Sequence, residues 1–412
     1  MPLDLKKVIT QIKNLSTLEA ENLNKTQLDS VYKLFSTVVK NEKTLLEKLL
    51  ITQNSKKSSF FFAIPALNLD KSETLETTYD FPETFKATHI AIASDGSQIN
   101  PSAHEVTSSF LINIGLVAIP YFSKNIPVTL LTEPKIYNSQ EDIAVSSLSE
   151  SIHEEDLVSY ERTLREIEEL VKLVKEYKQY NLPIVAFLDG TLIHWHIEKF
   201  SSLFIEEFIK RFSQTILELK ALNIPVVSFL SNSRSNELIN MLKIFNCPYK
   251  EVDCKKHCSN IATKQLPCNP CNDYIPVFDR RLIEKLFQKT NAKAGTRTIL
   301  YKSISKILSY YPDELKVFFF YINTGTEVAR VEIPAYVAKD NSLLELVHNA
   351  VAFQCNVGFG YPVTLSESHL QAVVNKSDRQ TFYNLIKEQF ARDKRTPVKL
   401  STKELKKRIS FV

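Results

Sequence analysis

The stretches His89-Ile90-Ala91-Ile92-Ala93-Ser94-Asp95-Gly96-Ser97 and Ile184-Val185-Ala186-Phe187-Leu188-Asp189-Gly190-Thr191 decide the fold. Each is an apolar run of strand length that ends in Asp-Gly followed by a hydroxyl residue. In open α/β sheets, ligand sites form at the carboxyl ends of the strands. We therefore expect the two Asp-Gly pairs to mark a site, although each pair taken alone is also typical of a turn.

Alternating helical and strand-like patterns surround these two stretches. Helical periodicity covers residues 157–179, 199–222, 236–245, 341–355 and 367–392, and further strands are expected at residues 109–121, 128–132 and 225–230. Strands at 317–321 and 328–333 are expected to form a hairpin around Asn323-Thr324-Gly325. This order predicts an α/β fold with a mixed, partly parallel sheet flanked by helices.

The chain is long enough for additions to one main domain, because a single core rarely organises more than roughly 250–300 residues. Residues 4–50 have apolar residues at helical spacing and contain no Gly or Pro, which predicts an N-terminal helical extension over residues 1–84. The main domain is then expected over residues 85–412. Within it we expect a Cys-rich insertion at 247–275 and a basic C-terminal tail at 384–412.

The composition is that of an ordinary globular protein. Of 412 residues, 44% are apolar and 24% are charged. No apolar run approaches the roughly 18 residues of a spanning helix, and the first residues show no cleavable apolar core. The sequence therefore predicts a cytoplasmic protein with no membrane partner.

Positive charge is concentrated at the C-terminus. The formal net charge is only +4, but residues 384–412 contain nine Lys or Arg against three Asp or Glu. Such a tail could neutralise phosphates through residues such as Lys403, Lys406, Lys407 and Arg408. A solvated helix explains the same composition equally well.

Asp95 and Asp189 supply the chemistry that the two strand ends suggest. Paired carboxylates are hard oxygen ligands, which suit Mg²⁺ or Mn²⁺. Phosphodiester hydrolysis uses two such ions to activate water and to stabilise the leaving oxygen. Residues 187–192 also resemble the Asp-x-Asp-Gly-Thr-Leu signature of haloacid-dehalogenase-type phosphatases, but Phe187 stands where the nucleophilic Asp would be, and this excludes that mechanism.

Four cysteines form a separate cluster. Cys254, Cys258, Cys268 and Cys271 have the spacing x3, x9 and x2. The set could hold structural Zn²⁺ or an iron–sulfur cluster. Free thiols are the alternative, since cytosolic cysteines are normally reduced.

Taken together, several motifs resemble the NurA nuclease family in their order along residues 85–410. These are Ala93-Ser94-Asp95-Gly96-Ser97-Gln98, Leu188-Asp189-Gly190-Thr191-Leu192, residues 228–237, Arg330-Val331-Glu332-Ile333-Pro334, and Gly360-Tyr361-Pro362 followed by His369. The resemblance implies an RNase H-like α/β fold and a Mn²⁺-dependent nuclease with 5′-to-3′ exonuclease and single-strand endonuclease activity. It also implies DNA end resection in double-strand-break repair, a HerA-type hexameric ATPase as partner, and a homodimer.

The resemblance also assigns residues. Asp95 and Asp189 match the two metal-binding aspartates, and Tyr361 and His369 match the C-terminal pair of the site. The family uses a Glu on the helix before the second Asp. Glu166 and Glu168 flank the apolar face of that helix at ~100° per residue; we select Glu168 and hold Glu166 in reserve. A solvated acidic face paired with nearby basic residues is the alternative for either.

His369 is expected at the start of a helix, where it could ligate metal or polarise the scissile phosphate. His104, His194 and His196 lie near the aspartates in sequence only. Arg234 could hold a DNA phosphate bidentately, although a helix N-cap at Ser235 explains its loop almost as well. The competing function is a non-catalytic RNase H-like module that helps to assemble a DNA-translocating motor.

Overall fold

The computed structural model describes residues 4–22, 25–67, 72–82, 88–101, 108–139, 143, 153–258 and 277–393. The chain divides into two compact units, one of residues 1–77 and 233–292 and the other of residues 78–232 and 293–412. The N-terminal helices thus share a unit with residues 233–292, which the sequence alone assigned to the main domain. None of the described helices combines the length and the apolar character needed to cross a membrane.

The first unit is mainly helical, which confirms the helical prediction for residues 4–50. Its elements are α1 (Leu5–Asn22), α2 (Lys25–Val39), α3 (Glu42–Ser55), β1 (Ala63–Pro65), α6 (Glu237–Asn246), α7 (Cys254–Cys258) and α9 (Asp279–Thr290). Asp279 is fully buried, and its carboxylate accepts the backbone N–H groups of Leu238 at 3.1 Å and Ile239 at 3.0 Å. These bonds satisfy orphan donors at the start of α6 and join α6 to α9.

The second unit contains a mixed sheet, as predicted. Its strands are β2 (Thr78–Tyr79), β3 (His89–Ile99), β4 (Phe110–Tyr121), β5 (Thr129–Tyr137), β6 (Ile184–Asp189), β7 (Val226–Leu230), β8 (Arg297–Thr298), β9 (Tyr301–Ser303), β10 (Val317–Asn323) and β11 (Val328–Pro334). The order within this unit is β9-β10-β11-β7-β6-β3-β4-β5, and β8 pairs with β10 and β2. Strands β3, β6 and β7 are parallel, and the β10–β11 hairpin is confirmed.

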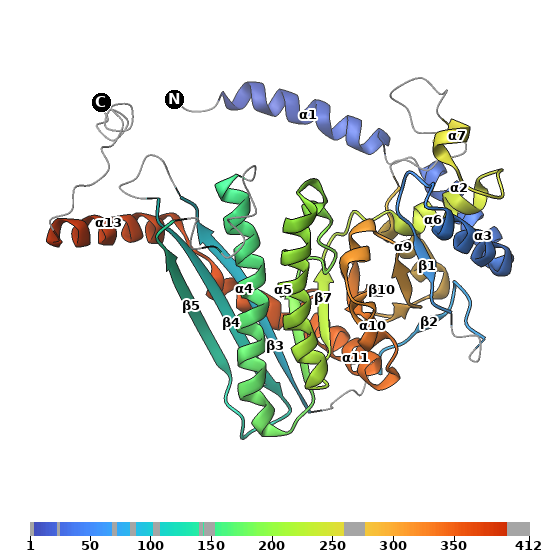
Figure 1. The fold of residues 1–412 in the computed structure, drawn as a ribbon. Helices are drawn as coiled ribbons and strands as arrows, with labels where there is room; N and C mark the ends of the chain where they lie inside the picture. Colours follow the sequence, from blue (N-terminus) through green and yellow to red (C-terminus); the bar gives the residue numbers. More distant parts are fainter. Residues whose placement is uncertain are drawn as a thin grey trace. The chain divides into compact units, whose positions relative to one another are not determined.

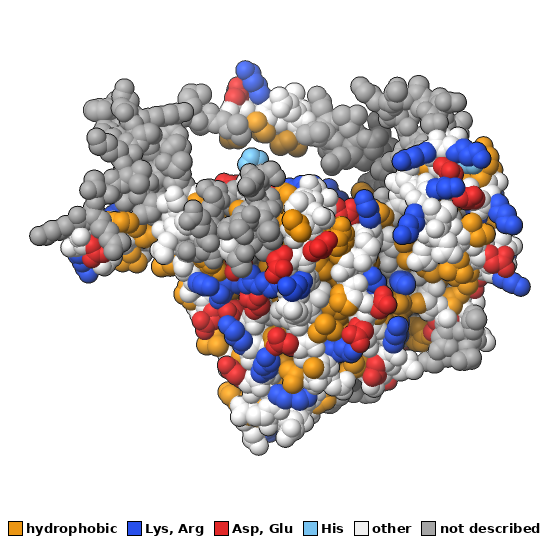
Figure 2. Space-filling view, viewed as in Figure 1, with side chains coloured by type: hydrophobic (Ala, Val, Ile, Leu, Met, Phe, Trp, Pro, Cys, Tyr) orange, Lys and Arg blue, Asp and Glu red, His pale blue; other side chains and the backbone are white. Residues whose placement is uncertain are grey.

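Helices cover both faces of this sheet. They are α4 (Glu154–Tyr177), α5 (Ser202–Ala221), α10 (Ala335–Ala338), α11 (Asn341–Val357), α12 (Val363–Ala372) and α13 (Lys376–Arg392), with short 3₁₀ turns η4 (Lys178–Tyr180), η5 (Trp195–Lys199), η6 (Lys306–Tyr310) and η7 (Asp313–Leu315). Helices α4 and α5 run side by side across one face (Figure 1). Their outer surfaces carry charges of both signs (Figure 2), including the Lys175–Glu218 ion pair.

The apolar stripe of α4 is buried as its periodicity predicted. Leu164, Ile167, Val171 and Val174 are at most 3% exposed and join the core formed with the sheet and α5. Burying a large aliphatic side chain contributes about 1.5–3 kcal/mol. The packing of this stripe therefore fixes which side of α4 faces the sheet.

Two glycines let helices approach the sheet closely. A Cβ on Gly96 would overlap the Glu166 carboxylate of α4, and a Cβ on Gly115 would overlap the backbone of α12 at Ser368 and Ala372. Gly115 pairs with Asp95 across β3 and β4, so both face the same side, whereas successive residues such as Asp95 and Gly96 face opposite sides. Helices α4 and α12 thus pack on opposite faces of β3 and β4.

Two predicted boundaries are wrong. Strand β3 does not end at Asp95-Gly96 but continues to Ile99, because β4 pairs with it along its whole length and overrides the turn preference of Asp-Gly. The helix predicted over residues 367–392 is two helices, α12 and α13. A capping box between Asn375 and Asp378 starts the second helix, so His369 lies in the last turn of α12 and not at a helix start.

Candidate active site

The sheet register brings Asp95 and Asp189 side by side. Strands β3 and β6 pair in parallel up to Ser94 and Leu188, and the next residue of each strand is the aspartate. Strand β6 ends there, and Gly190 turns the chain away with φ +83°. The two carboxylates therefore meet where the parallel part of the sheet opens.

Each aspartate is oriented by the glycine that follows it. The N–H of Gly96 donates to Asp95 Oδ1 at 2.8 Å, and the N–H of Gly190 donates to Asp189 Oδ1 at 2.9 Å. The second oxygen of Asp95 lies 2.7 Å from Nδ1 of His369, whose side chain is 65% exposed. One oxygen of each carboxylate is thus fixed by the backbone, while the other can serve a ligand.

Helix α12 holds His369 over Asp95 through its C-terminal backbone. The carbonyl of Ala372 accepts from Ser97 Oγ at 2.5 Å and from Asn113 Nδ2 at 2.9 Å. These donors lie on β3 and β4, and the missing side chain at Gly115 makes room for the contact. The position of His369 is therefore set by the sheet.

Tyr361 contacts the other aspartate. Its phenol interacts with the Asp189 carboxylate, and its ring packs edge-on against Phe229 at 5.4 Å between centroids. Burial and the charge of Asp189 raise the pKa of Tyr361 well above its ordinary value. The phenol therefore stays protonated at neutral pH and acts as a donor.

Glu166 is the third acidic group of the site. It lies over Gly96, and its Oε1 is 3.1 Å from Arg162 Nε, an ion pair without hydrogen-bond alignment. Burial raises the pKa of Glu166 to about 7; Arg162 opposes this shift, and the charges of Asp95 and Asp189 add to it. Desolvation at the rim of the site and the charge of Asp95 likewise raise the pKa of Asp189.

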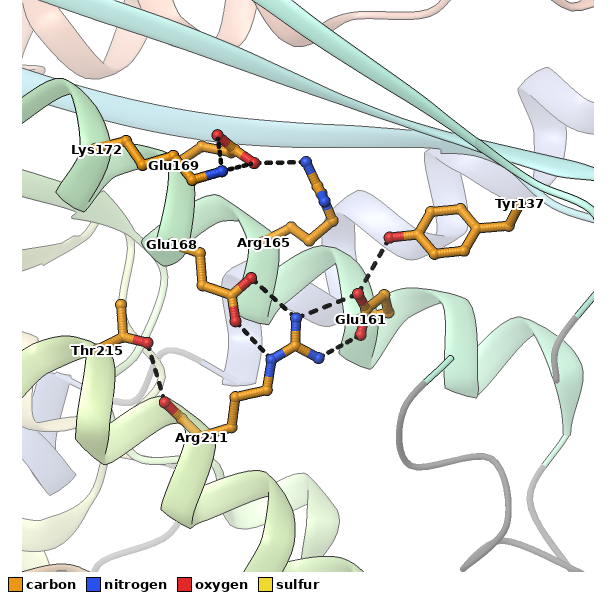
Figure 3. Close-up of polar contacts among 8 residues, drawn as sticks. All are labelled: Tyr137, Glu161, Arg165, Glu168, Glu169, Lys172, Arg211 and Thr215. Atoms are coloured by element: carbon orange, nitrogen blue, oxygen red, sulfur yellow. Dashed lines mark hydrogen bonds and ion pairs between the residues drawn. The ribbon is translucent and has the colours of Figure 1, made fainter. Parts of the chain in front are cut away.

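Glu168 lies in a different environment. Arg211 of α5 donates from Nε to Glu168 Oε1 at 2.5 Å and from a terminal nitrogen to Glu161 Oε2 at 2.6 Å, while the Tyr137 hydroxyl donates to Glu161 at 3.1 Å (Figure 3). Residues two positions apart on a helix point in directions that differ by about 200°, so Glu166 and Glu168 cannot contact the same neighbours. Of the two candidates, Glu166 therefore lies near the aspartates, whereas Glu168 pairs with Arg211.

A buried ion pair supports the turn after Asp189. Glu332 Oε2 accepts from the Thr191 hydroxyl and from the Leu192 N–H, both at 2.8 Å. Arg330 Nε donates to the other oxygen of Glu332 at 2.8 Å, and both side chains are 2% exposed. The guanidinium lies 3.6 Å from the centroid of Phe319. This network fixes the backbone that carries Asp189.

The remaining predicted site residues are not brought together with these groups. Arg234 is exposed, and no described residue pairs with its guanidinium. The N-cap position of α6 is Asn236, and Asp279 accepts the N–H groups of Leu238 and Ile239, while Ser235 accepts that of Glu237 at 3.5 Å. Cys254 and Cys258 lie one turn apart on α7, whereas Cys268 and Cys271 lie outside the described residues. Also outside them are His104 and the tail residues Lys403, Lys406, Lys407 and Arg408.

His194 and His196 belong to the aromatic packing. The His194 ring is buried and meets Phe212 edge-on at 4.6 Å between centroids, and burial lowers the pKa of His194 to about 3. His196 stacks on Tyr160 at 5.5 Å. Neither imidazole is part of the acidic site.

The acidic site fits a divalent cation by charge and donor type. Within the described residues, no three His, Cys, Asp or Glu side chains are preassembled as a metal cage. Burial raises the pKa of Glu166 and of Asp189, and repulsion from the neighbouring carboxylates adds to both shifts. A bound cation would relieve this repulsion, and carboxylates are the donors that Mg²⁺ and Mn²⁺ prefer. Asp95, Asp189 and Glu166 are therefore the residues that could hold one.

Sequence reasoning missed Gly115 and the part played by Glu332, and it offered Arg162 only as a partner of a solvated acidic face. The signal for Gly115 was a lone glycine inside the apolar run 109–121, which suggests close approach of another backbone. Arg162 precedes Glu166 by one helical turn, a spacing typical of an ion pair. Glu332 lies in one of the motifs of the family resemblance, but its partners could not be read from the sequence, because Thr191 and Leu192 come from a distant segment.

A family model matches more than half of the chain. The family model described as NurA domain matches residues 89–374, which include every residue of the acidic site. Similar solved structures include "Crystal structure of NurA", which is 11% identical with a TM-score of 0.37 and covers 79% of this chain and 94% of that chain. "Crystal structure of NurA with manganese" is 11% identical with a TM-score of 0.34, and the match covers 86% of this chain and 98% of that chain. No curated protein matches the chain.

Proposed function

The chain belongs to the NurA family, and from this premise we propose that it is a metal-dependent nuclease that hydrolyses phosphodiester bonds of DNA. One observation carries the proposal: the sheet register places Asp95 and Asp189 side by side, and the charges of both carboxylates act on the buried Glu166. His369 and Tyr361 border the same group. These residue types, in this arrangement, suit hydrolysis at phosphorus.

We assign Mn²⁺ or Mg²⁺ to the three carboxylates. A bound ion would lower the pKa of a coordinated water and offset the charge that develops on the phosphate oxygens. Asp95 and Asp189 each offer the oxygen that their neighbouring glycine does not use. Glu166 must give up its proton, and its loose contact with Arg162 allows its carboxylate to turn toward the ion.

The other side chains act on the phosphate and on protons. Nδ1 of His369 faces Asp95, so Nε2 is the ring nitrogen left to meet the phosphate; as an imidazolium, His369 would donate from Nε2 to a phosphate or leaving-group oxygen. Tyr361 remains protonated and holds Asp189 in position. During hydrolysis the water loses a proton as its oxygen bonds to phosphorus, the bond from phosphorus to the leaving oxygen breaks, and the leaving oxygen takes up a proton.

The finer features of the function are proposals that rest on family membership. They are 5′-to-3′ exonuclease and single-strand endonuclease activity, action in end resection and double-strand-break repair, a HerA-type ATPase as partner, and a homodimer. Arg234 and the basic tail would hold the strand through phosphates without reading base sequence. Structural Zn²⁺ at the cysteine cluster likewise stays a prediction.

Cleavage of end-labelled single- and double-stranded DNA tests the proposal. The wild type is compared with Asp189→Asn in Mn²⁺, Mg²⁺ and EDTA. Asp313→Asn is the matched control, because Asp313 is 97% exposed and lies outside the acidic site. We expect metal-dependent cleavage by the wild type and by the control, and none by Asp189→Asn. Full cleavage by Asp189→Asn would contradict the site, and no cleavage by wild type, even with the partner ATPase, would favour a non-catalytic assembly module.

A further inference from the structure

Phe359 is the most exposed large apolar side chain of the described residues. It is 92% exposed, with a backbone φ of +54°. Exposure of an aromatic ring forgoes hydrophobic stabilisation, and left-handed backbone is strained for a residue with a Cβ. Two unfavourable features at one residue indicate a role outside folding.

The local backbone would accept glycine more readily than phenylalanine. Helix α11 ends at Val357 with Gly358 as its C-cap, and the N–H of Gly360 donates to the Cys355 carbonyl at 2.7 Å. This bond is the six-to-one bond of a Schellman motif, in which the left-handed position, here Phe359, is usually glycine. The chain places glycines on both sides of this position and a phenyl ring on it.

The loop packs against the β10–β11 turn, and it leads directly into the acidic site. A side chain at Gly360, where φ is +103°, would overlap Thr326 of the β10–β11 turn. Tyr361 follows and contacts Asp189. Phe359 therefore precedes Tyr361, a residue of the site, by two positions in the chain. Among the described residues, no aromatic ring packs on Phe359.

We propose that Phe359 stacks on a nucleobase of single-stranded DNA next to the phosphate at the acidic site. Base stacking on an exposed aromatic ring is tolerant of sequence, as a nuclease without base readout requires. The inference rests on the proposed nuclease function and adds a strand-binding residue to it. The Schellman turn presents the ring without a rearrangement of the loop.

Binding of a fluorescein-labelled single-stranded oligonucleotide, measured by anisotropy in EDTA to prevent cleavage, tests the proposal. Phe359→Gly and Phe359→Leu should weaken affinity about 5- to 150-fold, equivalent to about 1–3 kcal/mol for one stacked base. Phe359→Trp should retain affinity. Removing the base at one position of the oligonucleotide should weaken the wild type and leave Phe359→Gly unaffected.

Thermal unfolding separates binding from folding. Because glycine suits the left-handed position, Phe359→Gly should unfold at the same temperature as the wild type or higher. Phe122→Ala is the matched control: Phe122 also has positive φ, +57°, and is 49% exposed, but its ring packs on Phe353 at 5.3 Å. Phe122 directly follows Tyr121, which pairs with His89 at the start of β3. His89 is six residues from Asp95 along this strand, so replacement of Phe122 should leave DNA affinity unchanged.

Three results would overturn the proposal. If Phe359→Gly bound DNA as tightly as the wild type, the stacking proposal would be contradicted, but the nuclease assignment would not. A changed oligomeric state with unchanged affinity would identify the ring as a contact between copies of the chain. Failure of the wild type to bind DNA at all would contradict both the stacking and the proposed function.

Discussion

At the scale of single residues, the position of Glu166 depends on a contact that no local pattern reveals. The sequence placed Glu166 and Glu168 symmetrically beside the apolar stripe of α4. Arg211 of α5 decides between them, because it binds Glu168 and Glu161 and leaves Glu166 beside the aspartates. Asp95 and Asp189 were predictable, since each directly follows an apolar strand run. The choice of glutamate required the packing of two helices.

The pKa of Glu166 predicts pH dependence of metal binding. The carboxyl must lose its proton to ligate a cation, so Mn²⁺ affinity should rise as pH increases toward about 7 and level off above it. Calorimetric titration with Mn²⁺ from pH 5.5 to 8.5 measures this, with Glu166→Gln as the comparison. A wild-type affinity that does not change below pH 7 would contradict the assignment.

The same shift predicts a change in stability without metal. A raised pKa in the folded state stabilises the protonated form; that stability is fully present below the ordinary pKa of 4.5 and is lost as pH rises through about 7. As pH rises from 4.5 to about 7, the unfolding free energy of the wild type should therefore fall relative to that of Glu166→Gln. Denaturant titrations in EDTA at several pH values measure it. A constant difference would show that Glu166 titrates normally.

Glu332 should matter for stability more than any other residue near the site. Glu332→Ala removes the carboxylate from the buried ion pair with Arg330, and removal of one partner of a buried ion pair costs about 3–5 kcal/mol. Glu332→Gln can still accept from Thr191 and Leu192, so its loss should be smaller. Urea unfolding followed by circular dichroism compares the two. Equal and small losses would mean that the ion pair is not what fixes the turn.

At the scale of elements, strand and helix types were predictable, but their ends were not. Strand β3 runs through Asp95-Gly96 because its partner β4 is twelve residues long. The helices α12 and α13 are separated by an Asn375 capping box that the continuous helical pattern concealed. In both cases the apolar periodicity predicted the type of secondary structure, while a pairing partner or a cap set where each element begins and ends.

Gly115→Ala tests the packing of α12 on the sheet. The added methyl group would overlap the backbone of Ser368 and Ala372, so α12 must shift and carry His369 away from Asp95. We expect a lower melting temperature together with a loss of cleavage. His369→Ala is the control, because it should reduce cleavage without lowering the melting temperature comparably. Normal cleavage by a folded Gly115→Ala protein would contradict the role of α12.

At the scale of the whole molecule, the mixed sheet with flanking helices was foreseeable from the order of strand and helix signals. The two compact units were not, because residues 233–292 join the N-terminal helices across more than 150 residues of chain. Family membership covers the part of the chain that holds the acidic site. The central claim is therefore that this part works as a metal site of one particular composition.

The neighbouring glutamates of α4 provide the most direct test of that claim. Glu166→Gln and Glu168→Gln make the same chemical change, carboxylate to amide, at positions two residues apart on α4. DNA cleavage in Mn²⁺ is measured for both variants. Glu166→Gln should lose about 100-fold or more in rate, because a ligand worth several kcal/mol of charge stabilisation is removed. Glu168→Gln should cleave near the wild-type rate and lose up to about 1 kcal/mol of stability from its partly exposed ion pair with Arg211. The reverse result, with activity lost in Glu168→Gln and kept in Glu166→Gln, would contradict the account.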